Sequence, residues 1–182
     1  MSAKPTDVLE EEHRLIQQAV AGMAALADVL EAGHAVEGQV LQDIVEFMRT
    51  YADKRHHGKE EDLLFPLLLA RGIPPQGCPI GALRGEHEEG RALVRAFAEA
   101  AAAYARDRAA TGAVITALRA LTDLYPNHIW KEDYLLFPMT NKVLGAEDQG
   151  RLWEQFQAVD QRLGDAMVSR FQQVVAGLPA RQ

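Results

Sequence analysis

The sequence predicts an all-α fold built from five helices. Ala, Leu, Glu, Arg and Gln dominate the 182 residues, and few stretches alternate strand-favouring residues with polar ones. Apolar residues instead recur at intervals of three and four, which places them on one face of each helix. A hydrophobic content of 48% with 25% charged residues is typical of a folded globular protein, and the length suits a single domain over residues 1–182.

Caps and helix breakers set the order of the elements. The side chain of Asp7 can cap a first helix, with Glu10 three residues later, and Gly33 ends it. The last helix is amphipathic, and we expect it to cover the other four or to form a homodimer surface. The expected helices span about 7–33, 36–72, 80–108, 111–143 and 147–176. Kinks are expected at three prolines inside these spans, Pro66, Pro126 and Pro138.

One motif occurs twice in the chain. The stretch from His56 to Pro66 (HHGKEEDLLFP) returns as His128 to Pro138 (HIWKEDYLLFP), and each copy contains a His-x-x-x-Glu pair. Residues four apart in a helix lie on one face with Cβ atoms roughly 5–6 Å apart, so each pair can hold one ion. A shorter Glu-His motif in the first helix also returns in the third. The repeated candidates for metal ligands are His13, His56, Glu60, His87, His128 and Glu132.

These candidates continue the apolar stripes of four helices, so each helix should aim one histidine inward. The stripes are Leu9, His13, Ile16, Val20, Met23, Ala27 and Leu30; Leu41, Val45, Met48 and Ala52; Leu83, His87, Gly90, Val94, Phe97, Ala101 and Tyr104; and Val114, Ala117, Leu121 and Leu124. Burying two carboxylates among them would cost several kcal/mol each unless a partner compensates. No Lys or Arg recurs on the same stripes, so a pair of metal ions answers the charge problem best.

A second histidine stands inside the first copy of the motif. His57 and Glu61 have the same spacing as the assigned pair. Stepping back from His57 by α-helical intervals meets polar residues, among them Asp53 and Arg49. We therefore keep His56 inside the site and place His57 at its rim.

Three residues beside the candidate histidines have simple explanations. Glu12 and Glu86 each precede a candidate histidine and are expected at the surface, with orientation of a histidine as the alternative. Arg91 follows His87 by one turn, where it either guards the site entrance or pairs with Glu88.

The remaining side chains of interest are aromatic, histidine or cysteine residues. Phe65 and Phe137 are expected in the core, where they would screen the site from water, and His34 is expected at the surface. The single cysteine, Cys78, cannot form an intramolecular disulfide, which suits a reducing compartment. We expect it in a loop, with a redox or dimer-forming thiol as the alternative.

The six candidate metal ligands outnumber the four that a structural zinc site uses. Imidazole and carboxylate together suit iron, manganese or zinc. If Glu60 and Glu132 bridge two metals, each metal takes two imidazoles and two carboxylate oxygens. An oxo or hydroxo bridge would bring each metal to five ligands and leave one position open on each.

Charge and hydropathy exclude other classes of function. The net charge of −7 and the absence of a basic stripe argue against a nucleic-acid partner. No stretch approaches the roughly 18 consecutive apolar residues of a membrane span, and the start of the chain lacks an apolar signal core. We expect a cytoplasmic protein.

The chain resembles the hemerythrin-like family, the HHE cation-binding domain. The resemblance covers about residues 7–143 and is carried by the stretch from Glu86 to Arg91 and by the two His-x-x-x-Glu…Leu-Phe-Pro segments. It implies an antiparallel up-and-down four-helix bundle around a non-haem di-iron centre, to which the helix at 147–176 is added. In the family's terms the six candidates become iron ligands, with both glutamates bridging.

The chain also departs from the oxygen-carrying members of the family. Those proteins bear a second histidine where this chain has Arg91, and an aspartate in the fourth helix, whereas here Glu132 follows His128 by four. The chain is more similar to the branch with four histidines and two glutamates, which is similar to iron–sulfur repair proteins and iron or oxygen sensors. The resemblance implies a di-iron protein that binds or reduces oxygen, hydrogen peroxide or nitric oxide, with a peroxide- or nitric-oxide-consuming oxidoreductase as one form of it. The alternative is non-enzymatic sensing, storage or donation of iron.

Overall fold

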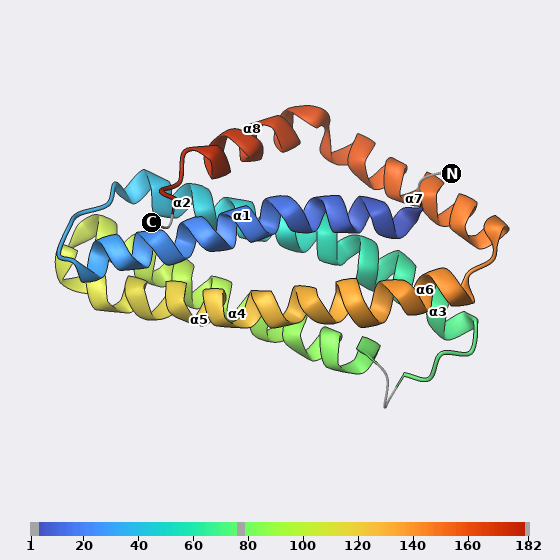
Figure 1. Ribbon diagram of the computed structural model, residues 1–182. Helices are drawn as coiled ribbons and strands as arrows, with labels where there is room; N and C mark the ends of the chain where they lie inside the picture. Colours follow the sequence, from blue (N-terminus) through green and yellow to red (C-terminus); the bar gives the residue numbers. More distant parts are fainter. Residues whose placement is uncertain (1–3, 76–78, 181–182) are drawn as a thin grey trace.

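The computed structural model describes residues 4–75 and 79–180, and these ranges contain helices, turns and loops but no strand. Four rods run up and down in an antiparallel bundle (Figure 1). The first is α1 (Pro5–Glu31), and the third is α4 (Pro79–Arg106). The second and fourth are composite: α2 (Gly38–Phe47), η1 (Met48–His57), η2 (Glu60–Leu64) and α3 (Phe65–Ala70); then α5 (Thr111–Lys131), η4 (Glu132–Leu136) and α6 (Phe137–Val143). The short 3₁₀ turn η3 (Arg108–Ala110) joins α4 to α5. The predicted all-α bundle is confirmed.

The predicted stripes form the core. Every residue of the first three stripes is buried, while in the fourth Leu124 is only half-buried and its neighbour Tyr125 is buried instead. The apolar side chains separate into two clusters along the bundle. On α1, His13 lies between Leu9 of one cluster and Ile16 of the other. The histidines therefore occupy the layer between the two apolar clusters.

The first helix begins two residues earlier than its predicted cap. Pro5 occupies the first turn, where its missing N–H is not needed. The backbone N–H of Lys4 donates to Asp7 Oδ2 at 2.8 Å, so Asp7 accepts from the residue before the helix and lies within the first turn. Asp7 thus marks the start of the helix as predicted, but it is the third residue of the helix and not its cap.

The two predicted kinks at Pro66 and Pro138 take the form of π-helical turns that precede each proline. Phe65 N–H donates to the Glu60 carbonyl, and Phe137 N–H donates to the Glu132 carbonyl, both across five residues. The proline that follows lacks an N–H and cannot continue the α-helical ladder, which restarts at α3 and α6. The repeated Leu-Leu-Phe-Pro thus builds the same wide turn twice. Pro126, in contrast, lies within the continuous helix α5.

The single C-terminal helix expected over 147–176 is broken into α7 (Ala146–Leu163) and α8 (Asp165–Ala176). Gly164 separates them with φ +80°, a conformation that only glycine adopts readily. Both helices fold back along the bundle in Figure 1, where α7 packs on α1 and the π-helical segments and α8 packs on α1 and α2. They cover the bundle as predicted; the homodimer surface stays a prediction.

Within the described ranges, no helix combines the length and apolar character that a membrane crossing needs. Cys78 lies outside the described residues.

Candidate metal centre

All six predicted ligands converge on one point in the layer between the apolar clusters. Each is at most 4% exposed. The donor atoms of His13, His56 and Glu132 lie within 4.8 Å of one another, and so do those of Glu60, His87 and Glu132. Four rods thus each supply at least one side chain, as the stripes predict.

His13 and His56 face each other through their inner nitrogens. The two Nε2 atoms are 2.9 Å apart. On the outer side, His13 Nδ1 donates to Asp133 at 2.7 Å and His56 Nδ1 donates to Glu12 at 3.0 Å. In neutral rings both Nε2 atoms then carry only a lone pair, so either a proton or a metal ion must lie between them. Two nitrogens bound to one ion at about 2.0–2.1 Å and at right angles would be about 2.9 Å apart, which fits a shared metal.

Each glutamate faces both halves of the site. Glu132 Oε2 lies 3.1 Å from His13 Nε2, while its Oε1 lies 3.3 Å from His128 Nε2 and 3.5 Å from His87 Nε2. Glu60 Oε2 lies 3.9 Å from His56 Nε2 and 3.5 Å from His87 Nε2. Both carboxylates therefore stand between the two groups of imidazoles.

The buried carboxylates have no ordinary partner. Among the described residues, none of the four carboxylate oxygens of Glu60 and Glu132 accepts a hydrogen bond, and the Nε2 atoms of His87 and His128 also lack one. Burial, reinforced by the charge of Glu132, raises the pKa of Glu60 well above its usual range. Burial would also raise the pKa of Glu132, but His128 and the other imidazoles hold the pKa of this carboxyl well below its usual range. Glu60 is therefore the member of the pair that takes up a proton more readily.

A carboxylate lies behind each of the four predicted histidines. Besides the two contacts already given, His87 Nδ1 donates to Glu61 at 2.6 Å and His128 Nδ1 donates to Glu86 at 3.0 Å. Such acceptors fix the tautomer and turn the free Nε2 toward a metal. The expected surface position of Glu12 is wrong, since only 2% of it is exposed; Glu86 is part-buried and plays the same role.

These outer carboxylates follow the internal repeat. Glu61 and Asp133 each come directly after a repeated glutamate, and each bonds the histidine of the other half. The sequence signal was an acid in the same place of both copies. It was missed because the two acids differ in type.

Two lysines neutralise the outer layer. Lys59 Nζ is fully buried and donates to Glu12 at 2.5 Å and to Asp160 of α7 at 2.7 Å. Lys131, at the same place in the second copy, donates to Glu86. Burial opposes ionisation of Glu12, but His56, Lys59 and a neighbouring arginine lower its pKa to about 2. These two lysines pair with the outer acids and make no ion pair with Glu60 or Glu132 among the described residues.

His57 is not at the rim. Only 3% of it is exposed, and its donor atoms lie within 4.8 Å of those of His87 and His128. The polar face behind it was inferred from α-helical intervals, whereas η1 is π-helical and has wider turns. The wider turn brings both His56 and His57 into the bundle.

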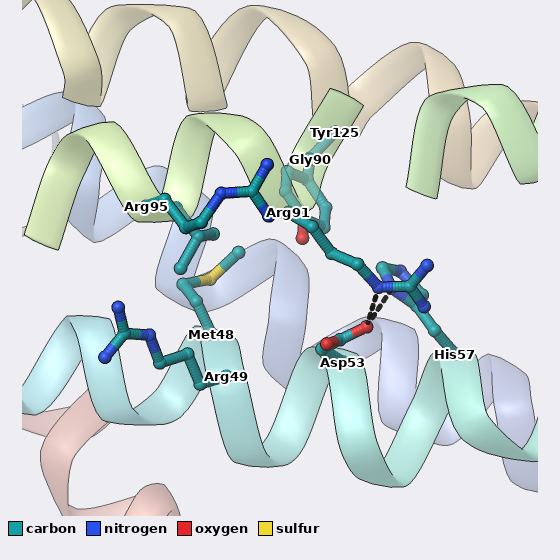
Figure 2. A pocket seen from close by; sticks show the side chains of 9 residues that line it. Met48, Arg49, Asp53, His57, Gly90, Arg91, Arg95 and Tyr125 are labelled. Atoms are coloured by element: carbon teal, nitrogen blue, oxygen red, sulfur yellow. Dashed lines mark hydrogen bonds and ion pairs between the residues drawn. The ribbon is translucent and has the colours of Figure 1, made fainter. Parts of the chain in front are cut away.

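Arg91 pairs with more than the predicted Glu88. Its Nη1 donates to Glu88 at 2.8 Å, its Nε to Asp53 at 2.9 Å and its Nη2 to Glu61 at 2.9 Å. Figure 2 shows this side chain crossing from α4 to Asp53 at the edge of a cavity of about 180 Å³. His57 and Tyr125 also line the cavity, so the cavity lies beside the site and has Arg91 at its wall.

The other predicted neighbours are confirmed. Phe65 and Phe137 are fully buried, and their rings stack on His87 and His13 with centroids 5.9 and 5.5 Å apart. They close the site along the bundle. His34 is exposed.

Nitrogen and oxygen donors from four helical rods, buried and short of hydrogen bonds, define the class: an all-α bundle that holds a metal centre in its core. The model of the hemerythrin HHE cation-binding domain matches residues 4–140. The chain belongs to this family, and its domain is a metal-binding one.

Similar proteins add no activity. An uncharacterized protein of Mycobacterium bovis and one from each of two strains of Mycobacterium tuberculosis are 28% identical over 148 residues, which is 80% of this chain and 56% of each relative. The chain thus spans little more than half the length of these relatives. No solved structure matches it significantly.

Proposed function

We propose that the protein is a non-haem di-iron protein that binds or reduces a small ligand, either oxygen, hydrogen peroxide or nitric oxide. The observation that carries this proposal is the pair of buried glutamates, each with unpartnered oxygens and each facing imidazoles on both sides. Such a pair suits two cations with shared carboxylates. His13, His56, Glu60, His87, His128 and Glu132 would hold them.

The donor set supports iron. Imidazole with carboxylate suits iron, manganese and zinc, and the ligand residues include no thiolate that would favour copper(I). We propose an oxo- or hydroxo-bridged iron pair, with manganese or zinc as substitutes. Two redox-active irons would supply two electrons to a small oxidant.

The protein's own residues supply the environment for that chemistry. Phe65 and Phe137 exclude water from one end of the site. Glu12 and Glu86 fix histidine tautomers. The cavity of about 180 Å³ beside His57 offers room for a small ligand next to the site.

The test combines metal analysis with rapid mixing. The purified protein should contain about two irons per chain and show oxo-to-iron charge-transfer bands in air, and the reduced protein should react with peroxide in stopped-flow measurements. His56→Ala should lose both iron and reaction, while His34→Ala, at an exposed histidine, should keep both. Unchanged turnover in His56→Ala would refute the proposal.

The alternative is a non-enzymatic protein that senses, stores or donates iron. It is favoured by the match to a cation-binding family and by a site whose acids need a cation for charge balance. This function predicts easy removal of iron by mild chelators, with a change in stability or oligomeric state and negligible turnover. Slow exchange together with rapid peroxide turnover would exclude it.

A further inference from the structure

We propose that His57, at the end of η1, is a fifth imidazole ligand of the metal centre. It would bind the same metal ion as His87 and His128. This inference rests on the proposed dinuclear site and deepens it. It assigns a ligand at a position outside the two repeated His-x-x-x-Glu pairs.

The environment of His57 is that of a ligand. Only 3% of His57 is exposed, and neither of its ring nitrogens makes a hydrogen bond to the described residues. Its donor atoms lie within 4.8 Å of those of His87 and His128. Its ring stacks on His87 with centroids 3.9 Å apart and meets His128 edge-on at 5.6 Å, so the His57 ring must tilt out of the stack to share an ion with His87. A buried imidazole with two unsatisfied nitrogens is unfavourable unless something binds it. A cation shared with His87 and His128 would satisfy the inner nitrogen.

The outer side of His57 repeats the arrangement of the other four histidines. Its Nδ1 lies 3.4 Å from Asp53 Oδ1, close but poorly aligned for a hydrogen bond. Each of the other histidines places Nδ1 on a carboxylate and Nε2 in the cluster. His57 therefore completes a set of five imidazoles, each backed by an acid.

Arg91 positions this part of the site. Figure 2 shows its side chain reaching Asp53 beside His57. The same guanidinium holds Glu61, the acid behind His87, through Nη2 at 2.9 Å. One cation thus fixes the carboxylates behind two neighbouring histidines, and Arg91 acts through them without being a ligand.

The internal repeat shows that this feature belongs to one half only. With the offset of 72 that relates His56 to His128, His57 corresponds to Ile129 and Asp53 to Tyr125. One metal position would then have three imidazoles and the other, at His13 and His56, would have two. Only the metal with two imidazoles would then keep an open position for a small ligand. This differs from the expectation from the sequence, in which each metal has one open position.

The repeat also supplies the variant for a test. His57→Ile copies the residue at the corresponding place, which is buried and packs in the core. Metal-free wild type, His57→Ile and the control His34→Ile would be titrated with Co(II) and followed by visible absorption. We expect two Co(II) ions in wild type and control, and at least tenfold weaker binding of one of the two ions in His57→Ile. In His57→Ala, added imidazole should enter through the adjacent cavity and restore that ion.

The outcomes separate the two proposals. If wild type binds fewer than two ions per chain, the dinuclear site itself is refuted. If wild type binds two and His57→Ile binds both with unchanged affinity and spectrum, His57 is a packing residue and this inference is overturned. Failure of imidazole to restore His57→Ala, with the variant folded by circular dichroism, would also overturn it.

A measurement on the unmodified protein covers the case in which the variants do not fold. Proton NMR of Co(II)-loaded wild type, with ¹⁵N-labelled histidine, counts the hyperfine-shifted imidazole N–H signals of bound rings. Five such signals are expected, one from each acid-backed histidine. Four signals would exclude His57 as a ligand.

Discussion

Lys59 shows how single residues support the centre without touching it. A lysine is almost never fully buried unless its charge is matched, and here Glu12 and Asp160 match it. Glu12 in turn accepts from His56, so the lysine secures the acid that orients a ligand. Lys131 holds the same place in the second copy but remains 25% exposed.

The repeat therefore provides a matched pair of substitutions. Lys59→Met should lower the free energy of unfolding of the metal-free protein by about 2–3 kcal/mol, because Glu12 stays buried with less compensation. Lys131→Met should lower it by less than about 1 kcal/mol, because water screens that pair. Chemical denaturation followed by circular dichroism measures both. Equal effects would contradict the role assigned to burial.

At this scale the inward position of the candidate ligands was predictable, and that of the acids behind them was only partly so. His13 and His87 interrupt strict apolar stripes, which makes an inward position readable from the sequence alone. Whether Glu12 faces inward depends on how far α1 is rotated against the second rod, and only tertiary packing fixes that rotation. The predicted rim position of His57 was wrong for a different reason: it assumed α-helical turns, whereas η1 is π-helical.

Helix boundaries were largely set by local chemistry, but helix type was not. The expected ends near Gly33 and Thr111 agree with α1 and α5. The π-helical segments depend on how the proline-restarted α3 and α6 pack, since an α-helical path would also satisfy the residues before each proline. Wide turns of this kind are frequent at functional sites, and here they carry Glu60 and Glu132.

Gly164 offers a test at the scale of one connection. Its φ of +80° allows α8 to turn back onto α1, so Gly164→Ala should lower the free energy of unfolding by about 1–2 kcal/mol. Gly150 is its control: it lies inside α7 with open space around its Cα, so Gly150→Ala should be neutral or stabilise by up to about 1 kcal/mol. Thermal unfolding of both variants decides. A destabilised Gly150→Ala, or an unaffected Gly164→Ala, would contradict the described connection.

At the scale of the whole molecule, the C-terminal helices are tied to the centre by charge. Asp160 of α7 binds Lys59 and also Arg55, and both cations reach Glu12 behind His56. The amphipathic pattern predicted a covering helix, but the sequence had no means to show that this cover meets the metal site. The single-domain organisation stays a prediction, and the relatives extend well beyond the length matched here.

Metal binding should release protons. In the metal-free protein burial lowers the pKa of His13, but Asp133 and Glu132 outweigh it and raise the pKa to about 9. Metal affinity should therefore rise with pH up to about 9, with about one proton released per chain from His13 at pH 7. Calorimetric titration in two buffers of different ionisation enthalpy measures this number.

The same shift has the opposite sign for the metal-free fold. Protonated His13 contributes stability that is fully present below pH 6.5 and is lost as the pH rises through about 9. Metal-free stability should fall over this window while metal affinity increases. An affinity that does not change between pH 6.5 and 9 would show that these groups are not displaced.

The central claim, that the buried glutamates and imidazoles hold two metal ions, is tested most directly by anomalous diffraction from crystals of the iron-loaded protein. The account predicts two anomalous peaks per chain at the iron edge, both between Glu60 and Glu132 and in contact with histidine Nε2 atoms. A single peak elsewhere, or no peak with the two glutamates sharing a proton, would contradict it.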